Sequence, residues 1–353
     1  MYVDGHLDIA YNVISAGRDV TRRVIETRAA EGSPRPGMGT CTVSLPDLAL
    51  GGVGLVFGTL FTLPATAQST DLPTEQSYHS AEEAHAQALA QLAVYRGLSD
   101  AGWLHLIGSR DDLAAHRAAW AAGDRTLGLL LLMENGDPIR DPSEAAWWHR
   151  QGVRIVGPAW QATRYCGGTR APGPLTDLGR ALMPELSRVG LILDISHMAE
   201  ESFWQALALF DGPVIASHSN CRALVAEARA DRHLSDAMIR ALLGRNAVIG
   251  TVLYNAFLAA EYVRDDPKER YGIDRLLRHI DHICQIAGDA RHVAIGSDLD
   301  GGLGREQIPR EIDSVADMPR IAEALSAAGY ADQDVAAIMG GSWLHFLESA
   351  LPA

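Results

Sequence analysis

The sequence predicts an α/β fold, a (β/α)8 TIM-type barrel that forms a single domain over residues 1–353. Eight short apolar runs alternate with segments of helical pattern, as expected for parallel strands joined by crossover helices. Polar His, Asp and Glu residues recur where these runs end. A doubly wound open sheet is the competing architecture, but no GxGxxG or GxxxxGK[ST] phosphate loop follows the first run. No Pro- or Ser-rich linker divides the chain.

The eight expected strands are mostly continuous runs of Val, Ile and Leu, which is typical of parallel strands that are covered on both faces. The first differs, because Asp4, His6 and Asp8 recur with a period of two and would leave one face of it. The expected strands cover residues 3–10, 53–61, 127–135, 153–160, 191–198, 213–220, 247–254 and 292–301.

Amphipathic segments between the runs predict helices over 80–98, 235–244 and 272–288. The last places its Ile and Leu residues on one stripe and ends at Gly288, which suits a C-cap. Three segments read as loops because they are rich in Pro and Gly or in charge. They are 32–39, 167–174 and 261–272, and the last could also cover the site as a lid.

Charge and composition exclude several classes of protein. There are 44 acidic and 30 basic residues, a net charge of −14, which argues against nucleic acid or an anionic membrane as a partner. Neither a secretory leader pattern nor an apolar run of the roughly 20 residues that a membrane span needs is present. Four widely spaced cysteines contain no CxxC pair, so we expect reduced thiols and a cytoplasmic location.

Six potential metal ligands close five of the eight expected strands. One such residue could be a helix cap or a satisfied core group. Six at the carboxyl ends of strands, where barrels carry their active sites, instead favour a metal centre of zinc or a related divalent ion. They are His6, Asp8, Glu134, His197, His218 and Asp298.

The number of these groups has a chemical consequence. One catalytic zinc takes three or four ligands, so six groups favour two ions with one bridging carboxylate. Two ions can hold a hydroxide between them and polarise a carbonyl, which is the chemistry of hydrolysis. A further carboxylate must then accept the proton of the nucleophile and transfer it to the leaving group.

At these residues the sequence resembles the renal (membrane) dipeptidase family of the amidohydrolase superfamily. The resemblance runs along nearly the whole chain, and HxD after the first strand makes it fairly specific. It rests on DGHLD (4–8), the Glu of MENGDP (134), GVR (152–154), DISH (194–197), SHSN (217–220), Arg-x-x-x-Asp (232–236) and GSDLDG (296–301). The resemblance implies two zinc ions per chain: His6 and Asp8 would bind one, His197 and His218 the other, and Glu134 would bridge them together with a hydroxide.

The resemblance also implies roles for residues around the metals. Asp298 would act as general base and acid, and Arg232 would bind the α-carboxylate of the substrate, although Arg222 and Arg229 compete for that role. Tyr11 would line the pocket or pack in the core. The implied substrates are small dipeptides, L-L and probably L-D, and a homodimer is suggested.

Three positions depart from the family pattern. Trp160 stands where the family commonly has a His that contacts the reacting carbonyl, so Arg164, Tyr165 or the metals would have to stabilise the transition state. Asn135 replaces a usual Gly and Ser342 a usual Asn. Two alternatives to a dipeptidase follow: the same scaffold acting on another amide or ester, such as an N-acyl amino acid or lactone, or a metal-binding homologue with weakened turnover.

Cys221, three residues after His218, also raises the possibility of a Cys–His nucleophile. We disfavour it because His218 serves better as a metal ligand and no third, orienting group is evident.

Overall fold

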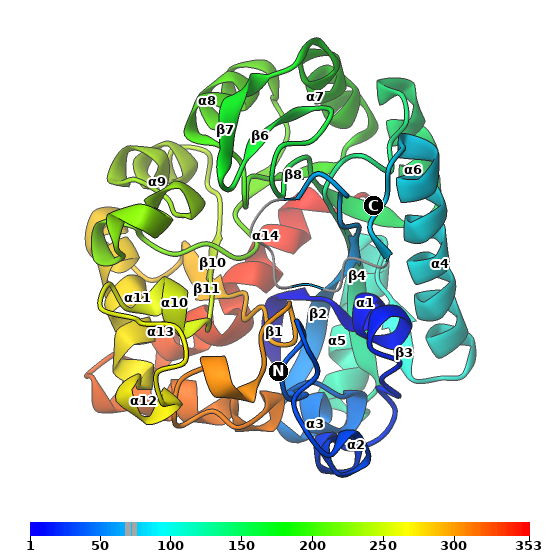
Figure 1. Ribbon diagram of the computed structural model, residues 1–353. Coiled ribbons are helices and arrows are strands. Elements are labelled where there is room, and N and C mark those ends of the chain that lie inside the picture. The colour runs from blue at the N-terminus through cyan, green and yellow to red at the C-terminus, as the bar shows by residue number, and fades with distance from the viewer. Residues whose placement is uncertain (68–71, 73–75) are drawn as a thin grey trace.

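The computed structural model describes residues 1–67, 72 and 76–353 (Figure 1). Parallel strands form its centre, in the order β1 (Tyr2–Leu7), β2 (Val53–Phe61), β4 (Leu127–Glu134), β5 (Val153–Gly157), β8 (Ile192–Asp194) and β9 (Val214–Ile215). A short strand, β3 (Leu104–Leu106), also pairs with β4. β10 (Ile249–Thr251) and β11 (Val293–Ile295) form a second parallel pair. This confirms the predicted parallel α/β architecture.

The ring of strands is linked differently at its two junctions. An isolated parallel bridge between Ala216 and Ile249 joins the two sheets. The first and last strands lie side by side (Figure 1), but the described residues show no strand ladder between them. Side chains connect them instead: the backbone N–H and the hydroxyl of Ser297 donate to the Asp4 carboxylate at 2.8 and 2.5 Å. The predicted closed barrel is therefore confirmed only in part.

Most strands end earlier than the sequence predicts. The 53–61 strand is reproduced, whereas the predicted 213–220 strand shrinks to two residues and the 3–10 strand stops at Leu7. Ile9 and Ala10 belong instead to a helix, α1 (Ile9–Ser15), because the backbone of Asp8 leaves the extended region at φ −86°, ψ 46°. Most of the predicted ligands thus lie in loops just beyond the strands.

Helices surround the strands (Figure 1), and the three predicted helices are present as α4, α9 and α11. α11 ends where Gly288 takes a left-handed conformation, φ 82°, as its C-cap pattern predicts. The other helix bounds are α2 (Val24–Glu31), α3 (Leu45–Leu50), α4 (Ala81–Asp100), α5 (Arg110–Ala121), α6 (Ala145–Arg150), α7 (Asp177–Val189), α8 (Glu200–Leu209), α9 (Asp236–Leu243), α10 (Asn255–Leu258), α11 (Ile273–Ala287), α12 (Pro319–Ala327), α13 (Asp332–Ala336) and α14 (Ser342–Ala350).

The prediction of a loop over 167–174 is wrong. This segment forms a two-stranded antiparallel hairpin of β6 (Cys166–Gly168) and β7 (Ala171–Leu175). The pairing holds because Arg170 adopts φ 60° in the tight turn, and turn composition alone did not reveal a hairpin with such short arms.

The core lies between the strands and the helices, and α14 passes behind the central strands (Figure 1). Its Trp343 is fully buried, packs edge-on against Phe57 at 4.9 Å and donates a hydrogen bond to the Ile295 carbonyl at 2.9 Å. The four cysteines are free thiols. Among the described residues, no helix combines the length and the apolar character that crossing a membrane would require.

Candidate metal centre

The six predicted ligands, from five separate strand ends, meet at one buried place. Glu134 lies at its centre, with one carboxylate oxygen 3.3 Å from His6 Nε2 and the other 3.2 Å from His197 Nε2 and 3.4 Å from His218 Nε2. His6 Nε2 lies 4.0 Å from both Asp8 and Asp298. The two oxygens of Glu134 therefore face different histidines, as a bridging ligand would.

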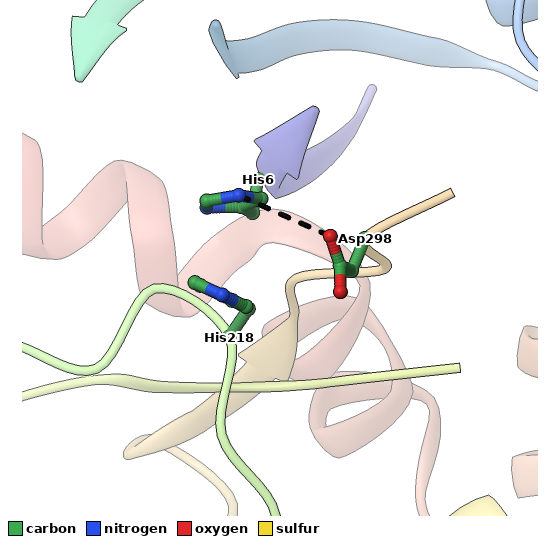
Figure 2. A group of neighbouring side chains, drawn as sticks. All are labelled: His6, His218 and Asp298. Atoms are coloured by element: carbon green, nitrogen blue, oxygen red, sulfur yellow. Dashed lines mark ion pairs between the residues drawn. The ribbon is translucent and has the colours of Figure 1, made fainter. Parts of the chain in front are cut away.

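Three overlapping groups of side chains could each hold an ion, with all donor atoms within 4.8 Å of one another. They are His6, Asp8 and Glu134; Glu134, His197 and His218; and His6, His218 and Asp298. Figure 2 shows the third group, in which the rings of His6 and His218 lie 3.6 Å apart and Asp298 faces His6 across the dashed contact.

The chemistry of the donor set fits a divalent cation. His6 Nε2 is buried and has no hydrogen-bond partner, although it points at the carboxylates. The Nε2 atoms of His197 and His218 lie 2.9 Å apart. Their two lone pairs would repel each other at this distance, and a cation or a proton held between them would remove that repulsion. Imidazole and carboxylate without thiolate suit zinc and related ions.

The electrostatics of the cluster also favour a cation. Burial lowers the pKa of His6, but the Glu134, Asp8 and Asp298 carboxylates outweigh this effect and raise the pKa to about 10. Burial raises the pKa of Glu134, yet the surrounding histidines hold that pKa well below its usual value.

The other two carboxylates shift in the opposite direction. Burial, with the Glu134 charge, raises the pKa of Asp8 to about 6. Burial, reinforced by the charges of Asp8 and Glu134, raises the pKa of Asp298 well above its usual value, against the opposing charges of His6 and Arg232. Asp298 is thus the carboxylate most ready to carry a proton.

Hydroxyl groups contact the predicted ligands on the side that faces away from the centre, a feature that the sequence analysis missed. Thr59 donates to Asp8, and the Thr169 hydroxyl lies 3.0 Å from His197 Nδ1. Ser217 contacts Nδ1 of both His6 and His218. Such contacts at Nδ1 leave Nε2 directed at the centre. The only signal in the sequence was the Ser before the His in SHSN.

Left-handed backbone conformations present several of these groups. His197 and Asp298 have φ values of 66° and 60°. Asn135, the departure from Gly next to Glu134, has φ 75°, and Asn tolerates this conformation better than most residues. Its amide donates to the Thr62 carbonyl and to the Tyr78 hydroxyl, both at 2.9 Å, so this substitution preserves the turn.

A cavity of about 150 Å³ opens onto the centre. The described residues that line it include three predicted site residues beside the ligands and Asp298, together with neighbours that the sequence did not indicate. The lining residues are Asp8, Tyr11, Phe61, Leu72, Glu134, Trp160, Gln161, Thr169, Arg170, His197, Arg232, Tyr254, Phe257, Asp298, Gly301, Gly302 and Leu303.

Arg232 lines the cavity and is only 4% exposed. Its guanidinium donates to the His218 carbonyl at 2.7 Å and to the Ser219 hydroxyl at 3.2 Å, whereas its Nε is buried without a hydrogen-bond partner. Of its competitors, Arg222 pairs with Glu200, and the side chain of Arg229 lies outside the described part of the chain.

Aromatic rings form another wall of the cavity. Phe61 packs against Tyr11 at 5.0 Å and against Trp160 at 5.4 Å, and Trp160 lies 6.1 Å from the His197 ring. Arg164 and Tyr165, which could have replaced the family His that is absent at Trp160, do not line the cavity. The Tyr165 hydroxyl donates to the Ile139 carbonyl, and the Arg164 guanidinium donates to the Arg140 carbonyl. Gln161 and Arg170 line the cavity instead.

Two further residues that the sequence analysis singled out lie outside the ligand cluster and the cavity. Ser342, the departure near the C-terminus, is on α14 and donates to the Ala290 carbonyl at 3.4 Å. Cys221 is buried and contacts the carbonyl of His279, and burial raises the pKa of its thiol far above its usual value. This geometry offers no activation to a cysteine nucleophile.

A parallel α/β fold with a buried His and carboxylate cluster at the carboxyl ends of its strands defines a metal-dependent hydrolase. Residues 1–351 match the family model of the membrane dipeptidases, peptidase family M19, and the chain belongs to this family. It is therefore a metal-dependent dipeptidase, an enzyme that hydrolyses peptide bonds.

Individual relatives agree with this assignment. A metallo peptidase from Rhodobacter sphaeroides, liganded with a phosphinate mimic of the dipeptide L-Ala-D-Ala, is 26% identical, with a TM-score of 0.78 over 99% of both chains. The dipeptidase AC, also a metallo peptidase, is 25% identical, with a TM-score of 0.79 over 100% of this chain and 99% of that one. The uncharacterized protein in the pqqA 5′ region of Klebsiella pneumoniae is 31% identical over 73% of this chain and 94% of its own length.

Proposed function

We propose that this enzyme is a dizinc dipeptidase that cleaves small dipeptides of L-L and L-D configuration. The observation that carries the proposal is the position of Glu134, one oxygen of which faces His6 while the other faces His197 and His218. His6 and Asp8 would hold one zinc ion, His197 and His218 the other, and Glu134 would bridge them. Bound in this way, the two ions supply an activated water-derived nucleophile and polarise the carbonyl under attack.

Asp298 would carry the proton in this reaction. It lies at the edge of the ligand cluster and also lines the cavity. Because its pKa is raised by burial and by the neighbouring carboxylates, it can accept a proton from the nucleophile and then hold it for the leaving amine.

Arg232 would bind the α-carboxylate of the substrate. A guanidinium has five N–H groups, and two of them are used by His218 and Ser219, which leaves three for a ligand. A planar, buried fork that lines a small cavity suits a carboxylate. The cavity volume of about 150 Å³ favours a substrate no larger than a dipeptide.

Tyr11 and Trp160 would contact the substrate from the aromatic wall, although Trp160 can offer only one N–H. Acceptance of a D-residue at the C-terminal side is supported by the relative that binds a mimic of L-Ala-D-Ala. We also propose a closed (β/α)8 barrel, a cytoplasmic location and a homodimer. Asp4 supports the barrel closure by joining the first strand to Ser297.

A panel of dipeptides tests this function. Zinc-loaded enzyme is assayed on L-Ala-L-Ala and L-Ala-D-Ala, each with a free and with an amidated C-terminus, and on an N-acyl amino acid and a lactone. The proposal predicts cleavage of the two free dipeptides that is much faster than cleavage of their amidated forms, and no turnover of the N-acyl amino acid or the lactone. Turnover of the N-acyl amino acid or the lactone, with none of the dipeptides, would show that the scaffold serves a different amide or ester.

A further inference from the structure

One ligand histidine from each of the two proposed metal sites contacts the same buried hydroxyl. Ser217 Oγ lies 2.7 Å from His218 Nδ1 and 3.3 Å from His6 Nδ1. His218 belongs to the ligand group with Glu134 and His197, and His6 to the group with Glu134 and Asp8. A single side chain thus contacts a ligand from each group.

Asp194 fixes the direction in which this hydroxyl can donate. The Ser217 hydroxyl donates to Asp194 Oδ2 at 2.5 Å, while Asp194 Oδ1 accepts the backbone N–H groups of Ser196 and Ser217 at 3.0 and 2.9 Å. A serine hydroxyl has one proton. Because that proton goes to the carboxylate, the serine oxygen can only accept from the imidazoles.

This direction determines the tautomer of the histidines. An oxygen that accepts from Nδ1 requires the proton on Nδ1, and the lone pair of each ring is then on Nε2. Those Nε2 atoms are the ones that face Glu134. The pair of Asp194 and Ser217 therefore presents two metal-binding nitrogens at once.

The main chain holds Ser217 firmly in this position. The residue is fully buried, and its carbonyl packs against Gly250 and Gly296, where an added Cβ would come within 2.0 and 1.8 Å of the carbonyl oxygen. Only glycine permits this approach, so the serine can move little relative to the strands around it.

We propose that Asp194 and Ser217 act together as positioning residues for the metal centre, setting the tautomer of His6 and His218 and hence the affinity of both metal sites. This inference rests on the proposed dizinc centre. Outer hydrogen-bond partners of metal ligands typically contribute about 10–100-fold to metal affinity. The shorter contact is to His218, so the site of Glu134, His197 and His218 should depend on Ser217 more strongly.

Metal affinity of the full chain tests the proposal. Wild type, Ser217→Ala and Asp194→Asn are stripped with chelator and titrated with Zn²⁺ in competition with a chromophoric chelator, and the visible spectrum of the Co²⁺-loaded forms is recorded. Ser342→Ala is the matched control, because it removes another buried serine hydroxyl that lies outside the centre.

We expect Ser217→Ala to weaken Zn²⁺ binding by about 10–100-fold, more at one site than at the other, and to shift the Co²⁺ bands. Asp194→Asn preserves shape but can donate to Ser217, which turns the serine proton toward an imidazole, so it should weaken binding at least as much. Ser342→Ala should bind as wild type. Thermal unfolding of the metal-free proteins identifies any variant that fails to fold. If Ser217→Ala does not fold, the Zn²⁺ affinity of the isosteric Asp194→Asn protein tests the proposal instead.

Wild-type Zn²⁺ affinity and Co²⁺ spectra in a folded Asp194→Asn protein would overturn the positioning role and leave the dizinc dipeptidase intact. Loss of metal in the variants of an enzyme that cleaves no dipeptide would uphold the positioning role and contradict the proposed substrate. A wild type that binds no Zn²⁺ would overturn both.

Discussion

Replacement of Arg232 by methionine should remove the proposed preference of the enzyme for a free C-terminal carboxylate. Methionine keeps the aliphatic length but offers no N–H group. Arg232 is 4% exposed, and its guanidinium has three N–H groups left after its bonds to His218 and Ser219, enough for a bidentate contact.

The magnitude follows from that contact. Each hydrogen bond to a charged group contributes about 1.5–3 kcal/mol, so two of them contribute about 3–6 kcal/mol. With 1.36 kcal/mol for each factor of ten, this corresponds to a loss of about 10²–10⁴ in kcat/KM for dipeptides with a free carboxylate. For C-terminally amidated dipeptides, which offer no carboxylate, the loss should be small.

The assay compares kcat/KM for one dipeptide in its free and amidated forms, in wild type and in Arg232→Met, with zinc content measured in both. Arg222→Met is the control, because Arg222 pairs with Glu200 rather than lining the cavity. We expect the free-to-amide ratio to fall close to one in Arg232→Met only. An unchanged ratio in that variant would refute the assignment of Arg232.

Three further results are expected. Gly301→Ala should lower kcat by about 10²-fold at unchanged zinc content, because the new Cβ would lie 1.9 Å from Asp298 Oδ1 and displace that carboxylate; kinetics and metal analysis check this. Zinc affinity of the stripped enzyme should rise from pH 6.5 to 9, since His6, with its pKa raised to about 10, must lose a proton to bind; a flat profile in competition titrations would contradict this. Trp343→Ala should lower the free energy of unfolding by about 3–5 kcal/mol in urea denaturation, because the fully buried ring also loses its bond to the Ile295 carbonyl.

Much of the site could be predicted because parallel strands bring their carboxyl ends together. His6 and Asp298 are 292 positions apart in sequence, yet Asp298 donates its backbone N–H to the His6 carbonyl at 3.3 Å. Apolar runs located the strands, and polar residues at their ends located the centre. The helix α11, which ends at Gly288, could likewise be predicted from the helical spacing of its Ile and Leu residues.

The rest depends on local backbone geometry that a hydrophobic pattern does not encode. The strands stop three residues before His197 and Asp298, and both residues adopt left-handed conformations, which residue type alone rarely indicates. Thr59 and Thr169 read as ordinary strand and loop residues, and only their contacts with Asp8 and His197 show that they orient ligands. The neighbours of Trp160 likewise required the structure, since Arg164 follows it closely in sequence but turns away.

The zinc content of the purified enzyme tests the central claim most directly. The chain is loaded with excess Zn²⁺, desalted and analysed by elemental mass spectrometry against its protein concentration. The position of Glu134, with His6 at one oxygen and His197 and His218 at the other, predicts two zinc ions per chain. A value of one or none would contradict the bridging role of Glu134 and the dizinc mechanism with it.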